Sequence, residues 1–183
     1  MHGAFATAEQ GVALFGLAAL ERGVFLLAPQ ATRPCGEGYC WSFAQDAKAI
    51  YSLIETTCAK YPIDQNRLSL IGYSMGCTMG LWLIAQNPGR FAFFAALGMG
   101  SAFEPWEHDD GGIDEDGLRA SAGTTRILLA VDQTDPTGTD AYFEANLARL
   151  RAAELHVATF RPNMGTHAVT AAMQARMLQA LPS

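Results

Sequence analysis

The sequence predicts an α/β protein, with a mostly parallel sheet of about five strands and flanking helices in a single domain over residues 1–183. Short apolar segments alternate with longer segments of helical periodicity, which is typical of strands joined by crossover helices. Half of the residues are hydrophobic and only 16% are charged, as expected for a sheet covered on both faces. A chain of this length is expected to fold around one core.

Five short segments are nearly continuous in apolar residues, which is the pattern of strands buried on both faces. They are residues 24–28, 68–71, 92–97, 127–131 and 155–160. Long loops follow three of these segments, at 29–41, 98–125 and 132–139. Because binding sites of parallel sheets form at the carboxyl ends of the strands, we expect a site where these loops meet.

Five helices are predicted between and after the strands. The first is expected to begin with a capping box of Thr7 and Gln10, in which each side chain bonds the other residue's backbone N–H. The second is expected to begin with a similar box of Ser42 and Gln45 and to end at Pro62. The other three are predicted over residues 75–86, 140–153 and 168–181.

The charge and the hydropathy pattern exclude several kinds of partner. The net charge of −6 and the sequence pI near 5.1 give no footprint for nucleic acid. No apolar segment approaches the roughly 20 residues of a membrane helix, so no membrane insertion is expected. The start of the sequence has no basic segment of a secretory signal, which favours a cytoplasmic location. A neutral or weakly polar small molecule is the expected ligand, without a cofactor.

The four cysteines leave two interpretations open. Cys35 and Cys40 are close enough in the sequence to form a disulfide, which would need an oxidising compartment, or they are buried thiols. Cys58 and Cys77 fall within predicted helices, as buried thiols. No pair of C-x2-C units is present, so no metal site is expected.

The strongest motif is Gly72-Tyr73-Ser74-Met75-Gly76, between a predicted strand and a predicted helix. This is the G-x-S-x-G turn of the α/β-hydrolase fold, in which a strained backbone presents the serine hydroxyl above the sheet. The helix that follows points its N-terminus at charge developing on the substrate. Ser74 is therefore the predicted nucleophile, the alternative being an inert serine in a tight turn.

A serine needs a base, and this fold orders its residues as serine, then acid, then histidine. Of the three histidines after Ser74, His167 is favoured because it follows the last strand and precedes the last helix. His156 lies within a predicted strand, and His108 lies in the acidic loop that also contains Trp106.

The acid is expected just after the strand at 127–131. Asp135 is favoured because Pro136 promotes a turn that can direct its carboxylate to the histidine. Asp132 is the alternative, or it holds the loop by accepting from backbone N–H groups. Asp140 is expected to be the N-cap of the next helix.

Two backbone N–H groups are expected to stabilise an oxyanion. The N–H of Met75 comes with the serine turn itself. The other is expected from Ala4, because His2-Gly3-Ala4-Phe5 looks like the His-Gly loop that supplies this donor in the fold. The alternative is a chance dipeptide near a frayed terminus.

The segments 61–76, 24–29 and 40–42, with Trp41 in the last, resemble esterases related to polyhydroxybutyrate depolymerases, feruloyl esterases and the phospholipase/carboxylesterase group. The resemblance covers most of the chain and weakens after Gly98. It implies small carboxylesterases that act on esters of aromatic acids, on short acyl esters or on polyesters. By position, Trp41 and Phe5 would then line the acyl or aromatic subsite, the alternative being ordinary packing in the core.

One departure concerns the strands before the His-Gly loop, of which such proteins have about three and this sequence has none. One of them would lie between the strands at 24–28 and 68–71. Three outcomes are open: the two flanking strands pair directly, a second copy fills the gap in a homo-oligomer, or the sequence is a shortened product.

The sequence therefore predicts a carboxylic ester hydrolase that uses Ser74, His167 and Asp135 through an acyl-enzyme. A serine peptidase or thioesterase with the same residues is the first alternative, because acyl transfer is common to all three. A non-catalytic hydrolase domain is the second.

Overall fold

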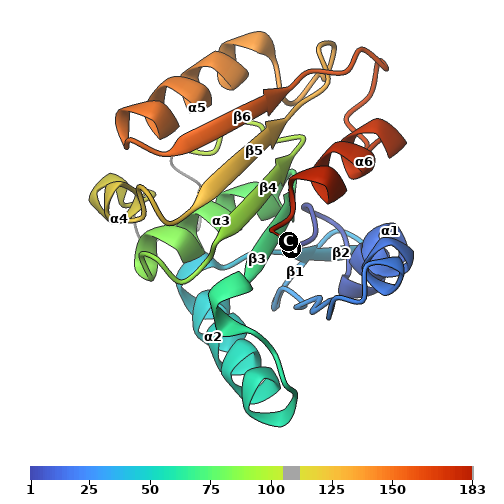
Figure 1. The fold of residues 1–183 in the computed structure, drawn as a ribbon. Helices are drawn as coiled ribbons and strands as arrows, with labels where there is room; N and C mark the ends of the chain where they lie inside the picture. Colours follow the sequence, from blue (N-terminus) through green and yellow to red (C-terminus); the bar gives the residue numbers. More distant parts are fainter. Residues whose placement is uncertain (105–111, 183) are drawn as a thin grey trace.

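The computed structural model describes residues 1–104 and 112–182. Its main sheet has four parallel strands in the order β3-β4-β5-β6 (Figure 1). These are β3 (Ser69–Tyr73), β4 (Phe93–Leu97), β5 (Arg126–Ala130) and β6 (His156–Phe160). Four of the five predicted strands are thus confirmed, with bounds shifted by one or two residues. All five residues of β4 are buried, as a central strand covered on both faces requires.

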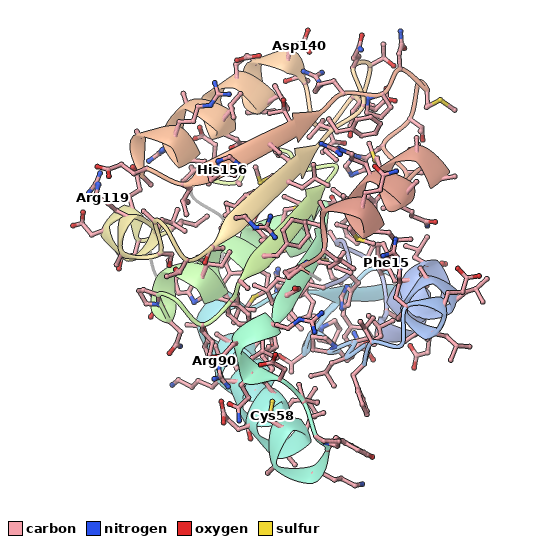
Figure 2. The ribbon with its side chains drawn as sticks, viewed as in Figure 1. Phe15, Cys58, Arg90, Arg119, Asp140 and His156 are labelled. Carbon is pink, nitrogen blue, oxygen red and sulfur yellow. A yellow bond between two sulfur atoms is a disulfide. The ribbon has the colours of Figure 1, made fainter. Side chains whose placement is uncertain are left out.

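Helices cover both faces of this sheet. On one face lie α2 (Phe43–Lys60), α3 (Met75–Gln86), α4 (Glu115–Ala120) and α5 (Asp140–Ala152). On the other lie α1 (Ala8–Glu21) and α6 (Ala171–Ala180). Phe15 extends from α1 into the hydrophobic cluster between these two helices and the sheet (Figure 2). The parallel sheet and its two helical layers confirm the predicted α/β fold.

The predicted capping box of α1 is present, because Thr7 Oγ1 accepts from the Gln10 N–H and the Thr7 N–H donates to Gln10 Oε1. The box predicted for Ser42 and Gln45 is wrong. The Ser42 side chain makes no cap bond, and its backbone N–H donates over 2.8 Å to the carboxylate of Asp46. Asp46 is buried and also accepts from a hydroxyl outside the helix, so tertiary contacts override the local pattern.

The N-cap predicted for α5 is also wrong by one residue. Thr139 is the N-cap, and Asp140 instead binds the guanidinium of Arg161 at 2.7 Å. The short helix α4 was not predicted within the loop 98–125, although Asp114 caps it as an N-cap aspartate should. A 3₁₀ turn, η1 (Gln65–Arg67), precedes β3.

A small hairpin of β1 (Arg33–Cys35) and β2 (Gly38–Cys40) was missed by the sequence analysis, because three-residue strands leave no periodic pattern. The disulfide between Cys35 and Cys40 closes this hairpin, which is one of the two interpretations left open above. Cys58 and Cys77 are free thiols in helices, as expected; Cys77 is buried as predicted, whereas Cys58 is only partly buried.

The strand predicted at 24–28 is wrong, because this segment has no assigned strand and pairs with no neighbour. Phe25 within it is 63% exposed. Among residues 1–104 and 112–182, the facing edge of β3 pairs with Met1 alone, which bonds Ile71 and Tyr73 in the parallel pattern. Segment 24–28 and β3 both line a cavity of about 900 Å³. Direct pairing of these two segments is therefore excluded, and without a partner for its backbone groups the segment cannot form a strand.

Among the described residues, no helix is both long enough and apolar enough to span a membrane.

Candidate active site

Ser74 lies at the turn between β3 and α3 with a left-handed backbone, at φ 50° and ψ −123°. The two glycines of the motif allow close approaches that no side chain would permit. A Cβ on Gly72 would lie 2.5 Å from the Gly76 carbonyl oxygen, and a Cβ on Gly76 would lie 2.4 Å from that of Met1. The motif therefore packs β3, α3 and the first residues of the chain together around the serine.

His167 reaches Ser74 from the loop between β6 and α6. Its Nε2 is 3.0 Å from Ser74 Oγ, and its Nδ1 is 2.8 Å from Asp135 Oδ2. Since a carboxylate only accepts, Nδ1 carries the proton and Nε2 is free to accept one from the serine. The structure thus brings together the three residues predicted as nucleophile, base and acid.

Asp135 is held rigidly in the loop after β5. Its side chain is buried, and Oδ1 accepts from the backbone N–H groups of Thr137 at 2.7 Å and Gly138 at 2.9 Å. These bonds leave Oδ2 directed at His167. A carboxylate fixed in this way keeps the imidazole in one orientation and one tautomer.

Asp132, the alternative acid, makes no contact with the histidine ring. Its buried carboxylate accepts from the backbone N–H groups of Thr134 at 3.0 Å, Met164 at 2.6 Å and Gly165 at 3.2 Å. Burial by itself raises the pKa of Asp132, but these hydrogen bonds outweigh it and hold the pKa below the ordinary value of 3.8. Asp132 therefore ties the loop of Asp135 to the loop that carries His167.

The two other histidines considered for the base are His156 and His108. His156 begins β6 and is exposed, away from the turn (Figure 2). His108 and Trp106 lie outside the described residues. Within residues 1–104 and 112–182, no group of three or more metal-binding side chains is found.

Two backbone donors lie beside the serine. Met75 is the first residue of α3, so its N–H has no partner within the helix. Gly3 packs against the turn, since a Cβ on Gly3 would lie 3.3 Å from the Ser74 Cβ. Ala4 follows Gly3, and among the described residues no group accepts a hydrogen bond from its N–H. The His-Gly segment therefore packs directly against the serine turn.

The two residues expected to line a substrate subsite differ sharply. Phe5 is 65% exposed and directly follows Ala4, with a left-handed backbone at φ 62°. Trp41 is only 1% exposed, and its Nε1–H donates to the His2 carbonyl oxygen at 2.9 Å. Burial argues against the expected substrate contact of Trp41, because its ring packs behind the loop.

Sequence reasoning missed Tyr73, whose ring lies 5.3 Å from the ring of His167. Burial and the nearby charge of Asp135 raise the pKa of its phenol, which keeps Tyr73 neutral. In the sequence, the one indication that Tyr73 lies near the histidine was its position directly before the serine of the motif.

A parallel α/β sheet that presents Ser, Asp and His from the carboxyl ends of three of its strands, with the serine in a G-x-S-x-G turn, defines an α/β-hydrolase. Solved structures with the same fold include a carboxylesterase from Mesorhizobium loti, at 19% identity and a TM-score of 0.77, covering 98% of this chain and 84% of that one. A carboxylesterase from Bacillus cereus is similar at 15% identity and a TM-score of 0.76, covering 98% and 84%. Arabidopsis thaliana SOBER1 is similar at 14% identity and a TM-score of 0.74, covering 97% and 93%.

The chain belongs to the Esterase family, described as "Putative esterase", whose family model matches residues 34–181. No curated protein matches the chain in a sequence search. Membership of this family supports a carboxylic ester hydrolase activity, while the solved structures, all below 20% identity, establish the fold.

Proposed function

We propose that this protein is a serine carboxylesterase in which Ser74 is the nucleophile, His167 the general base and Asp135 the residue that orients it. The observation that carries the proposal is the continuous hydrogen-bonded chain from Ser74 Oγ through both ring nitrogens of His167 to Asp135. A hydroxyl so placed can transfer its proton as it attacks an ester carbonyl.

In acylation, His167 Nε2 takes the Ser74 proton while Oγ bonds to the ester carbonyl carbon. The carbonyl oxygen receives the electron pair and becomes an oxyanion, which the N–H groups of Met75 and Ala4 stabilise. Loss of one such donor typically costs about 10²–10³-fold in kcat. The imidazolium then protonates the departing alkoxide, and an acyl-enzyme on Ser74 remains.

In deacylation, water replaces the alcohol. His167 removes a proton from this water, which attacks the acyl carbon through a second oxyanion, and the proton then passes to Ser74 Oγ as the carboxylic acid leaves. Throughout the cycle the carboxylate of Asp135 orients His167 and stabilises the imidazolium. The backbone N–H groups of Thr137 and Gly138 hold this carboxylate in place.

The proposed substrates are small or aromatic esters, and polyesters are a second substrate class to be assayed beside them. The exposed ring of Phe5 beside the second oxyanion donor supports an apolar or aromatic group on the substrate. The net charge of −6 disfavours anionic substrates.

The test is hydrolysis of p-nitrophenyl acetate, butyrate and an aromatic ester by the wild type and variants. Ser74→Ala is expected to lower kcat by about 10⁴-fold or more, and Asp135→Asn by roughly 10³–10⁴-fold, because the histidine then adopts the wrong tautomer. Ser69→Ala, on the same strand, is the matched control and is expected to leave turnover unchanged.

Amide and thioester analogues of the same acyl group, assayed in parallel, separate an esterase from a peptidase or a thioesterase. A fluorophosphonate probe should label Ser74 in the wild type, as read by peptide mass. Wild-type turnover that survives Ser74→Ala would refute the proposal, and no turnover of any of the three substrate classes would favour a non-catalytic domain.

A further inference from the structure

The loop that carries the second oxyanion donor is held by the β1–β2 hairpin. The Tyr39 N–H donates to the Ala6 carbonyl oxygen at 3.1 Å, and these two residues form an isolated antiparallel bridge. Gly38 lies against the backbone of the loop, because a Cβ there would be 2.2 Å from the Phe5 carbonyl oxygen. The hairpin thus fixes the end of the loop that follows Ala4.

Trp41 fixes the other end of the same loop. Its indole Nε1–H donates to the His2 carbonyl oxygen at 2.9 Å, and its ring stacks on the His2 ring with centroids 4.6 Å apart. His2 and Trp41 are both buried. Since a buried carbonyl without a donor is costly, this bond favours one orientation of the peptide after His2.

The His2 side chain reinforces this arrangement. Its Nε2 accepts from the Ala31 N–H at 3.2 Å, so the proton is on Nδ1, which donates to the Gly3 carbonyl oxygen at 2.7 Å. Burial lowers the pKa of His2, which keeps the ring neutral and both bonds intact. The carbonyls of His2 and Gly3 are therefore both held, and the Gly3 carbonyl belongs to the same peptide group as the Ala4 N–H.

The Cys35–Cys40 disulfide connects these two supports. It joins the ends of the hairpin across a Cα–Cα distance of 5.5 Å, and Cys40 directly precedes Trp41. A covalent link across a loop restricts the conformations it can adopt when the surrounding contacts loosen. The hairpin that carries Tyr39 and the residue that carries the indole donor are thereby held as one unit.

We propose that Trp41 and the disulfide-closed hairpin are the positioning elements of the oxyanion hole, and that they orient the Gly3–Ala4 peptide so that its N–H points at the oxyanion. The inference rests on the proposed function and assigns Trp41 a role through the backbone, without contact with the substrate. Interactions that act only on the transition state change kcat more than KM.

The first test is Trp41→Phe, which keeps an aromatic ring against His2 and removes only the N–H donor and part of the ring. We expect kcat for p-nitrophenyl butyrate to fall about 10- to 100-fold, with KM within about twofold, because a small misorientation of a catalytic group has an effect of this size. Trp82→Phe is the matched control. Trp82 is also buried, but it stacks on Phe43 and not on His2. The Trp82→Phe variant should therefore keep a kcat near the wild-type value even if its Tm falls.

The second test measures the oxyanion hole directly with a trifluoromethyl ketone. Ser74 Oγ bonds to its carbonyl carbon, the proton passes to His167, and the former carbonyl oxygen becomes an oxyanion. Trp41→Phe should weaken inhibition by the same factor as it lowers kcat/KM. A purely structural role would lower Tm without changing this affinity.

The third test removes the disulfide. The double variant Cys35→Ala/Cys40→Ala is expected to lower kcat several-fold, and a dithiol reductant, which is oxidised as it converts the wild-type disulfide to two thiols, should have the same effect. The double variant itself should not respond to the reductant. If Trp41→Phe fails to fold, the kcat of the cysteine double variant and its affinity for the trifluoromethyl ketone test the positioning role instead.

The outcomes separate this inference from the function on which it rests. No Ser74-dependent turnover in the wild type overturns both. Wild-type turnover with unchanged kcat and unchanged ketone affinity in Trp41→Phe, or in the cysteine variant if the tryptophan variant does not fold, overturns the positioning role alone.

Discussion

The half of the molecule built on β3–β6 and the segment before β1 are packed in different ways. The strands β4 and β5 are buried nearly throughout. The segments that follow β3, β5 and β6 hold Ser74, Asp135 and His167 within hydrogen-bonding distance. The segment over residues 1–31 leaves large apolar side chains exposed, with Leu17 at 70%, and borders the cavity beside β3. The proposed nucleophile, base and acid thus lie on the tightly packed part, and one proposed oxyanion donor lies on the other.

The difference indicates how each part keeps its shape. In the sheet, close packing of side chains at crystal-like density restricts the site. In the N-terminal segment, a few specific bonds to His2, Gly3 and Ala6 replace that packing. A site supported by few bonds is more sensitive to the loss of any one of them. The three predictions below test how tightly the two parts are packed and how the packed part is held.

The largest expected effect is the difference in reaction rate between the two free thiols, Cys58 and Cys77. Cys77 lies in α3 against the sheet, where its thiol donates to the Leu97 carbonyl oxygen, and burial raises its pKa from 9.0 to about 12. Its reactive thiolate is therefore about a thousandfold rarer than that of an ordinary thiol. Cys58 is partly exposed and lines the cavity. Iodoacetamide should modify Cys58 at least about 1,000-fold faster than Cys77 in the folded protein, as measured by peptide mass.

In denaturant the two thiols should react at similar rates, which is the internal control. Comparable rates in the folded protein would mean that α3 opens as readily as the cavity wall, and the contrast between the two regions would then be wrong.

The next prediction compares one leucine from each region. Leu129 on β5 is fully buried, so Leu129→Ala should lower the free energy of unfolding by about 3 kcal/mol through lost burial and a cavity. Leu17→Ala, on the exposed face of α1, should change it by less than about 0.5 kcal/mol. Urea unfolding with a common m-value measures both. A loss near 2 kcal/mol for Leu17→Ala would show that this face of α1 is covered in solution.

Sequence patterns predicted best the part that depends on local rules. The strands of the sheet are mostly apolar, the G-x-S-x-G glycines match close backbone approaches, and the order of Ser74, Asp135 and His167 follows the fold. The segment 24–28 has the same apolar pattern as the other strands. It is no strand because strand formation requires a neighbour, which composition does not reveal.

The differences between sequence and structure at Ser42 and Trp41 also arise from contacts that composition does not reveal. Ser42 looks like a helix cap by spacing, but the carboxylate of Asp46 takes its backbone N–H. The resemblance places Trp41 in a substrate subsite, but its buried indole N–H donates to the His2 carbonyl oxygen. In both cases a contact between segments distant in the sequence decides the role, and no pattern along the chain encodes it.

The smallest expected effect comes from Asp132, which connects two loops within the packed region. Asp132→Asn keeps the shape but replaces one of the two acceptor oxygens with an NH₂ group. Either the Met164 N–H, which donates to Oδ2, or the Gly165 and Thr134 N–H groups, which donate to Oδ1, then lose their acceptor, so we expect a loss on the order of 2 kcal/mol at pH 7. Because the folded-state pKa of Asp132 is below its unfolded value near 3.8, the carboxylate stabilises the fold above about pH 4, and this contribution is lost as the pH falls through the folded pKa. The difference between wild type and variant in urea unfolding should therefore be constant from pH 7 to 5 and shrink towards pH 3. A difference independent of pH would mean that the charge of Asp132 does not hold the His167 loop, and that the shape of its side chain alone does.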